Sequence, residues 1–263
     1  MIRRRIDRAT GTLAIFASFV VIAPMIALLA NVPWNSFFSH LTQDNSLSAI
    51  ELSLWSSVLA TTISVLLGVP LAWVLARGNE RVTNILRPFV LAPIVLPPTV
   101  AGMALLALLG RNGLLGKYIY QATGWSMPFT SVAVVVTGVF VGMPFLVLIV
   151  ESNFRHLPKD LEEAAVIDRA STRDVFSLIA LPQIRNGIAT GAVLAWARAL
   201  GEFGATMMFA GSLPGRTQTW AMQVYIDMDI DMGSAYTLSA IMLVIAVSVV
   251  FALRKPLTQA FTT

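Results

Sequence analysis

The chain has 263 residues and no cysteine; 56% of its residues are hydrophobic, only 12% are charged, and its formal net charge is +4. Soluble domains carry about 25% charged residues, and a soluble fold of this size cannot bury so much apolar surface. The composition also excludes disordered, collagen-like and coiled-coil chains, and the absence of cysteine excludes disulfide scaffolds and thiolate metal sites. An integral membrane protein remains.

Six apolar stretches are long enough to cross a bilayer as helices of about 20 residues. They lie near 11–30, 50–76, 86–109, 129–150, 186–210 and 234–253. Because backbone in lipid must satisfy its own hydrogen bonds, the stretches predict an all-α membrane protein with six transmembrane helices. We expect one bundle over residues 1–263, without a separate soluble domain. The first stretch is longer than the apolar region of a secretory signal, so we expect a span there and not a cleaved leader.

The third stretch is the least regular, because it contains four prolines. Pro88, Pro93, Pro97 and Pro98 each remove a backbone donor. We therefore expect this span to be bent, with a broken section around Leu96-Pro97-Pro98-Thr99.

Lys and Arg residues are divided unequally between the two sets of loops, and this bias predicts orientation. One set of loops carries fourteen of these basic residues: Arg3, Arg4, Arg5, Arg8, Arg77, Arg81, Arg87, Arg155, Lys159, Arg169, Arg173, Arg185, Arg254 and Lys255. The opposite set holds only Arg111, Lys117 and Arg216, and Arg198 lies inside a span. The rule therefore predicts that both termini are cytoplasmic, and the positive net charge reflects topology, not binding to nucleic acid.

The longest polar interval, residues 151–187 between spans four and five, has the pattern of two short helices at about 158–182. Pro158 suits the first turn of the first helix. Acidic residues follow Pro158, and they favour the positive N-terminal end of that helix. Ser171 and Asp174 predict a capping box at the start of the second helix, and Pro182 its end. Apolar residues on both helices predict docking into another protein; the alternative is an amphipathic linker on the membrane surface.

Within this interval, Glu163-Ala164-Ala165 and the later Ile179-x-Leu181-Pro182 have the spacing of the EAA motif. The segment therefore resembles the coupling element of permease subunits of binding-protein-dependent ABC importers. The resemblance implies contact with a cytoplasmic ATPase through Glu163 and neighbouring Glu162, close packing for Ala164 and Ala165, and anchoring of the second helix by the later residues.

One position departs from that family. The family usually places glycine between the two helices, where this chain has Arg169. Glycine there would serve a left-handed turn, and an arginine in that conformation costs on the order of 1 kcal/mol. Either the turn differs, or a contact of Arg169 offsets the cost, with Asp168 and Asp174 as possible partners within the chain.

Arg198 and Glu202 are predicted to lie near the middle of the fifth span, four residues apart on one helix face. Charges at this depth cost roughly 2.5–3.5 kcal/mol each, so both should face protein or a water-filled path. The pair either orients helices at an interface or places Arg198 along the route of an anion. Four glycines of the span would allow close helix approach or a backbone-lined passage: Gly187, Gly191, Gly201 and Gly204.

The stretch from Ala197 to Thr206, with Pro214-Gly215-Arg216-Thr217-Gln218-Thr219 beyond it, resembles molybdate permease subunits, as do Leu96-Pro97-Pro98-Thr99 and the glycines after it. The resemblance implies a homodimer, two ATPase subunits that carry ATP and magnesium, an external oxyanion-binding protein, and a prokaryotic cell membrane; no cofactor is expected in this chain. We expect molybdate as the substrate, with tungstate a close second. The shared Ala-Arg-Ala-x-Gly-Glu core leaves a sulfate or thiosulfate permease open, and an ion-coupled secondary transporter is the alternative of another class.

Other patterns in the sequence are weaker evidence of function. Asp227, Asp229 and Asp231 alternate as at the start of a calcium loop, but Met232 and Leu238 stand where that loop needs glycine and glutamate. We expect a solvated loop, or a surface that touches the external partner. The sequence has no phosphate-binding Gly-x-x-x-x-Gly-Lys-Ser/Thr motif, and no catalytic or metal-binding residues are expected.

Overall fold

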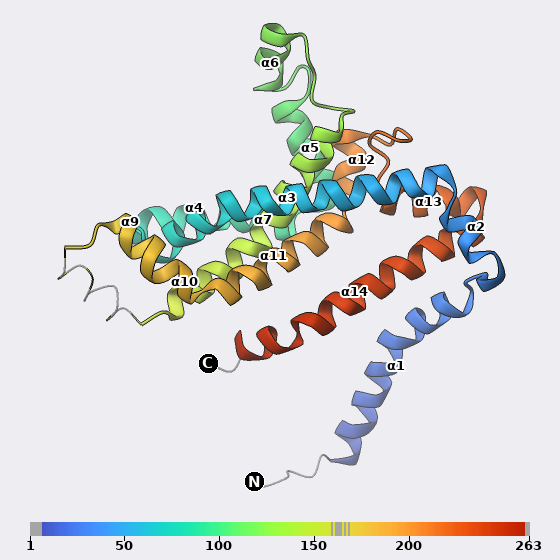
Figure 1. Ribbon diagram of the computed structural model, residues 1–263, viewed down its shortest axis with the longest axis horizontal. Coiled ribbons are helices and arrows are strands. Elements are labelled where there is room, and N and C mark those ends of the chain that lie inside the picture. The colour runs from blue at the N-terminus through green and yellow to red at the C-terminus, as the bar shows by residue number, and fades with distance from the viewer. Residues whose placement is uncertain (1–6, 159, 161–164, 166, 168, 261–263) are drawn as a thin grey trace.

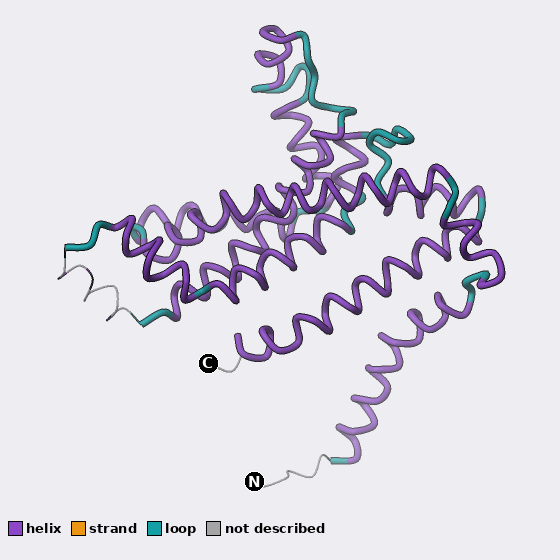
Figure 2. The backbone as a smooth tube through the Cα atoms, viewed as in Figure 1, coloured by secondary structure: helices purple, strands orange, loops and turns teal. Residues whose placement is uncertain are grey.

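The computed structural model describes residues 7–158, 160, 165, 167 and 169–260, and every regular element in those residues is helical (Figure 2). Side chains of Arg8 and of residues 253–260 are outside this description. In chain order the elements are α1 (Arg8–Ala30), η1 (Trp34–Ser36), α2 (Phe37–Leu41), α3 (Asp44–Arg77), α4 (Glu80–Val95), α5 (Pro98–Leu109), α6 (Gly116–Thr123), α7 (Ser131–His156), α9 (Thr172–Asp174), η2 (Val175–Ala180), α10 (Leu181–Gln183), α11 (Arg185–Leu200), α12 (Gly204–Ala210), α13 (Trp220–Ile230) and α14 (Met232–Ala260).

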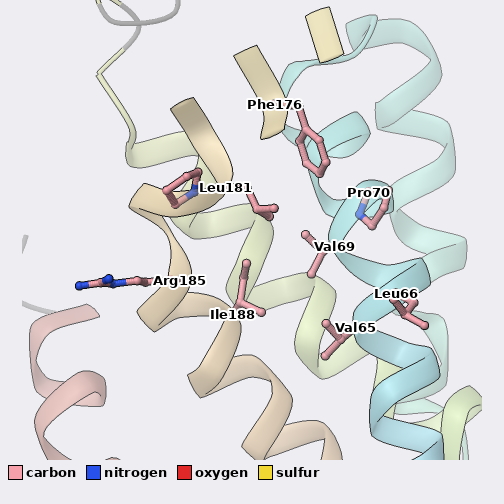
Figure 3. Close-up of a pocket in the computed structure, with 9 residues that line it drawn as sticks. Val65, Leu66, Val69, Pro70, Phe176, Leu181, Arg185 and Ile188 are labelled. Carbon is pink, nitrogen blue, oxygen red and sulfur yellow. The ribbon is translucent and has the colours of Figure 1, made fainter. Parts of the chain in front are cut away.

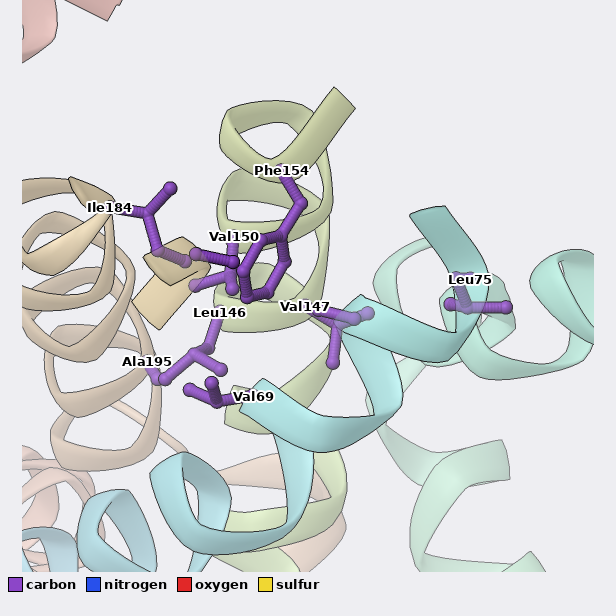
Figure 4. Close-up of a cluster of buried hydrophobic side chains, with 10 residues drawn as sticks. Val69, Leu75, Leu146, Val147, Val150, Phe154, Ile184 and Ala195 are labelled. Carbon is purple, nitrogen blue, oxygen red and sulfur yellow. The ribbon is translucent and has the colours of Figure 1, made fainter. Parts of the chain in front are cut away.

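Three helices, α3, α7 and α11, pack against one another and form the centre of the molecule (Figure 1). Small residues allow this close approach: a Cβ on Gly138 would lie 2.8 Å from Ala60 Cβ, and one on Gly68 would lie 2.9 Å from Leu146. Apolar side chains from the three helices and the adjoining turn form the main buried cluster, in which Figure 4 labels Val69, Leu75, Leu146, Val147, Val150, Phe154, Ile184 and Ala195.

Within the described part of the chain, four helices are long and apolar enough to cross a membrane: Ala9–Ala30, Asp44–Arg77, Ser131–His156 and Met232–Ala252. They coincide with the first, second, fourth and sixth expected spans. The third expected span divides into α4 and α5, which are separated by Leu96 and Pro97. The predicted break at the paired prolines is therefore confirmed.

The fifth expected span is not one continuous helix. Helix α11 ends at Leu200, and α12 begins at Gly204. Placing Arg198 and Glu202 near the middle of a helix was wrong, because Arg198 lies in the last turn of α11 and Glu202 lies in the break. Glycine at 201 and 204 favours such a break, since glycine is a poor helix former.

The outer elements surround this centre unequally. Helix α1 is apolar on all sides, contacts α14, and is otherwise exposed along its length (Figure 1). Helix α5 packs on α12, and with α6 it projects from the long helices. One end of the molecule holds the turn between α3 and α4, the end of α7, and α9. This end is here called the Arg-rich end, after Arg77, Arg87 and Arg155.

Candidate coupling segment and transport site

The second half of residues 151–187 folds as the helical run α9–η2–α10, and Ser171 caps its start. The Asp174 amide donates to Ser171 Oγ over 3.2 Å, and the Ser171 amide donates to Asp174 Oδ2 over 3.1 Å. The predicted capping box is therefore confirmed. Hydrogen bonds from the Ser171 hydroxyl and amide hold the pKa of Asp174 below its ordinary value.

The run ends at Gln183, one residue after the predicted stop at Pro182, and its axis makes an angle of 75° with α11. Pro182 has no N–H to donate to the carbonyl four residues earlier. The preceding residues, Val175–Ala180, are wound as a wider π-helix. Single π-helical turns are rare, and they occur frequently at functional sites.

Arg169 adopts the left-handed conformation that glycine would serve, with φ of 63°. The Ala170 amide donates to the Ala165 carbonyl over 2.9 Å, the six-residue bond of a Schellman turn. The first alternative, a different turn, is thereby removed: the chain makes the glycine turn with an exposed arginine. Of the other predicted coupling residues, Glu162, Glu163 and Ala164 lie outside the described residues, as does Asp168.

The apolar side of the run packs mainly against its own bundle. The Phe176 ring lies 5.5 Å from the Trp73 ring and 6.2 Å from the Phe154 ring, centroid to centroid. Val175 is buried, whereas Leu178 remains 71% exposed. Part of the surface that the sequence assigned to a partner is therefore an intramolecular contact, and Leu178 is left outside it.

An apolar groove of about 490 Å³ lies between this run, α3 and α11 (Figure 3). Val65, Val69 and Ile188 form its floor and walls, and Leu181 faces it from α10. Arg185 extends away from these apolar side chains. Thus Leu181 and Pro182, two predicted coupling residues, line a groove that joins the run to two long helices.

Arg198 and Glu202 form the predicted ion pair across the break in the fifth span. Glu202 is buried, and its Oε1 also accepts the Ala205 amide over 2.7 Å. The carboxylate therefore satisfies a free donor at the start of α12 while it binds the end of α11. Arg198 keeps 30% of its side chain exposed.

The two broken spans meet at their breaks. A Cβ on Gly204 would lie 2.7 Å from Pro98 Cβ, and one on Gly102 would lie 2.6 Å from the Ala205 carbonyl oxygen. The structure thus brings together Pro98 and Gly204, which the sequence places more than a hundred residues apart. Pro97 forms the N-terminal boundary of α5 in the same region.

Thr206 is buried and lines a small cavity whose wall also includes Ser53, Ser56 and Thr219. The expected close approach of glycines holds for Gly187, Gly191 and Gly204, but a Cβ on Gly201 would meet only the Ala197 carbonyl, at 3.6 Å. Gly201 is exposed and serves the break, not a helix contact.

The sequence did not identify a buried carboxylate at the Arg-rich end. Glu151 Oε1 accepts from Arg87 over 2.6 Å and from Arg155 over 2.9 Å, with the Glu151 side chain only 6% exposed. A lone acidic residue at the end of an apolar span was the available signal, since charges there need partners.

The aspartates near the start of α14 are also not a solvated loop. Asp227 is buried in α13, accepts from Gln223 over 2.7 Å and accepts from Ser234 over 2.8 Å. Asp231 pairs with His40 over 3.1 Å. Only Asp229 keeps the exposed position that we expected for all three.

Comparison with known proteins places these features in one family. A family model described as "Binding-protein-dependent transport system inner membrane component" matches residues 64–255. The chain is 41% identical over 237 residues to the molybdenum transport system permease protein ModB of Mycobacterium tuberculosis. This alignment covers 90% of this chain and 89% of that protein. It is 26% identical over 248 residues to the sulfate transport system permease protein CysT of Escherichia coli, covering 93% of this chain and 89% of that protein.

A solved structure shows the same fold. The bacterial alginate ABC transporter, in complex with a periplasmic protein that binds an alginate pentasaccharide, contains a chain that matches with a TM-score of 0.73 at 16% identity, covering 97% of this chain and 95% of that one. The chain is thus a multi-pass membrane protein and belongs to the family of inner membrane components of binding-protein-dependent transport systems.

Proposed function

We propose that this chain is the membrane-spanning permease of an ABC importer that moves molybdate into the cytoplasm, with tungstate as a second substrate. The observation that carries the proposal is the 41% identity to a ModB permease over 90% of the chain. Shared identity over nearly the whole length supports a shared transport role more strongly than the fold does, because one fold hosts many functions.

In the assembly that we propose, two copies of the chain form a homodimer, two ATPase subunits dock at the Arg-rich end, and an external binding protein delivers the oxyanion. Each copy contributes six spans, of which the third and fifth are broken, and both termini are cytoplasmic. The lipid bilayer surrounds the apolar outer helices. ATP and magnesium belong to the ATPase subunits, and this chain carries no cofactor and catalyses no reaction.

The coupling role rests on residues 158–182. Leu178 is exposed and available to a partner, while Phe176 ties the same run to α3 and α7. Closure of the ATPase dimer would thus move the ends of two long helices through one rigid contact. Glu162, Glu163, Ala164, Ala165, Arg169, Ile179, Leu181 and Pro182 form the proposed coupling set.

The proposed pathway or interface residues lie where the two broken spans meet: Arg198, Glu202, Gly201, Gly204, Thr206, Pro97 and Pro98. Breaks in transmembrane helices are tolerated where the backbone is buried in protein or lines a water-filled path. Such breaks are also points at which helices can change direction between inward and outward access.

Uptake by the complex reconstituted in liposomes with its ATPase and binding protein tests the substrate. We expect ATP-dependent uptake of radiolabelled molybdate that excess tungstate suppresses and excess sulfate does not. The similarity to CysT favours a sulfate permease as the second candidate, and uptake blocked by sulfate but indifferent to molybdate would select it. Transport by the permease alone, without ATPase or ATP, would instead indicate an ion-coupled transporter and contradict the ABC assignment.

A further inference from the structure

The apolar groove beside the run α9–η2–α10 exists because this run turns away from α11. The two helical axes diverge by 75° at Ile184, so the run and α11 cannot pack on each other along their lengths. Helix α3 packs on α11 and meets the run through Trp73 and Phe176. A space of about 490 Å³ is left between the three (Figure 3). Sites for small molecules typically have volumes of about 300–1,000 Å³.

The lining of the groove indicates the chemistry of an occupant. Eight of the nine residues that line it are apolar, and the ninth is Arg185. A hydrocarbon chain needs no hydrogen bonds and fits such a lining. An inserted peptide would bury its backbone N–H and C=O groups against apolar side chains, and each unpaired group costs free energy. The lining therefore favours a hydrocarbon over a polypeptide segment.

The groove lies at the depth of lipid acyl chains. Residues 65–70 of α3, which form one wall, lie seven to twelve residues before Arg77, the last residue of this span. At a rise of about 1.5 Å per residue, they are about 10–18 Å from that end. The hydrocarbon core of a bilayer is about 30 Å thick, and arginines at helix ends reach toward its boundary. Leu66 lines the groove and is 67% exposed, so the groove is open to the surface of the bundle.

Arg185 places a cationic group at the edge of the groove. It is the first residue of α11, it is exposed, and its side chain extends away from the apolar side chains (Figure 3). Its stem can thus cover apolar surface while the guanidinium faces a polar headgroup. Guanidinium groups match the geometry of phosphate oxygens. A phosphate uses only some of the five N–H donors, so this contact does not require Arg185 to be free of other partners.

We propose that this groove binds one acyl chain of a phospholipid from the leaflet at the Arg-rich end, with the phosphate of that lipid beside Arg185. The bilayer is itself apolar, so the hydrophobic effect does not favour the groove over bulk lipid. The preference comes from van der Waals packing along the groove and from the contact with phosphate. This binding is independent of the proposed import of molybdate and is tested without it.

The test counts lipids that stay bound to the purified full-length permease in detergent. Native mass spectrometry measures retention of phosphatidylglycerol and, separately, of a diacylglycerol with the same acyl chains but no phosphate. We expect the wild type to retain phosphatidylglycerol and to retain diacylglycerol at least about fivefold less, because only the first lipid can bind Arg185 through its phosphate.

Two groove variants and two matched controls make the result specific. Leu66→Trp adds bulk at a lining residue, and Arg185→Gln removes the guanidinium; each should lower retention of phosphatidylglycerol at least about fivefold. Leu67→Trp adds the same side chain at the next exposed position, which is not part of the lining, and Arg173→Gln removes the same charge from an exposed position of α9. Both controls should retain the lipid as the wild type does.

Wild-type retention in Leu66→Trp or Arg185→Gln, or equal losses in the groove variants and their controls, would overturn the proposal. Equal retention of the two lipids by the wild type would also overturn it. Leu66 and Arg185 are exposed, so both variants should fold, and their unfolding temperatures are compared with that of the wild type.

A second copy of the chain is the alternative occupant. The sequence has no cysteine, so Leu66→Cys carries a single benzophenone label at the groove. In nanodiscs that contain phosphatidylglycerol, irradiation should give a lipid adduct of the monomeric chain. A crosslinked dimer in place of this adduct would assign the groove to the second copy and overturn the lipid proposal.

Discussion

Gly204 lies directly against Pro98, so that the break in the fifth span is packed onto the first turn of α5. The 2.7 Å that would separate a Cβ at 204 from Pro98 Cβ is shorter than any ordinary contact. Pro98 has no backbone N–H to donate, and Gly204 has no side chain to fill the space between the helices. The two broken helices can therefore touch at this point.

Gly204→Ala should destabilise the fold by about 1–3 kcal/mol, because the added methyl group must displace Pro98 or α12. Gly201→Ala is the matched control, since a Cβ there would meet only a carbonyl at 3.6 Å. Thermal unfolding midpoints in detergent compare the two. Equal midpoints would show that the contact between the breaks does not constrain the fold.

Glu151→Ala should cost about 3 kcal/mol, at the low end of the range for removing one partner of a buried ion pair, because Arg87 and Arg155 remain 30% and 46% exposed. The variant leaves two guanidiniums without their carboxylate at the junction of α4 and α7. Glu51→Gln, at an exposed position of α3, should change stability by less than about 0.5 kcal/mol. Unfolding free energies in mixed micelles test both, and a Glu151 variant as stable as the control would contradict the structural role.

Arg169→Gly should strengthen the turn before α9, because glycine adopts the left-handed conformation without the cost of about 1 kcal/mol that arginine bears. Arg173→Gly, inside α9, should weaken the same segment, since glycine is unfavourable in a helix. Hydrogen exchange of the Ala170 amide, which donates to Ala165, reports the local effect. Slower exchange in Arg169→Gly is expected; faster exchange would mean that Arg169 makes a contact that outweighs its strain.

Ser171→Ala should raise the pKa of Asp174 toward its ordinary value, because the hydroxyl donor is lost. In the wild type the lowered pKa means that the cap contributes stability above the unfolded value of about 3.9, and that this contribution is lost as the pH falls through the folded value. Carboxyl-carbon NMR of the full chain labelled at aspartate measures the shift. An unchanged Asp174 titration would show that the capping bonds do not form.

A double variant can show whether the ion pair of Arg198 and Glu202 has a structural role or a role in conducting the anion. Glu202→Met alone should impair folding, since it leaves Arg198 without its carboxylate and removes the acceptor of the Ala205 amide. The pair Arg198→Met with Glu202→Met should fold better than the single variant if the residues only stabilise the break. A well-folded double variant that keeps molybdate uptake supports the structural role, and one that loses uptake with unchanged ATPase binding supports a role in the pathway.

The sequence alone determined what short-range chemistry and composition control. Unbroken apolar length predicted α1, α3, α7 and α14, and the missing donors of Pro97 and Pro98 predicted the break in the third span. The capping box at Ser171 also followed from local pattern, because its hydrogen bonds span only three residues.

Tertiary structure decided the contacts between residues far apart in the chain. The pairing of Glu151 with Arg155 spans one helical turn, but Arg87 reaches Glu151 from a different helix, and no local rule brings them together. The buried position of Asp227 and the break at Glu202 likewise depend on which neighbours α13, α14 and α12 find. In a membrane protein every span is apolar, so apolarity reveals where helices cross but not how they pack; the packing is set by a few small, broken or charged positions whose partners only the folded chain supplies.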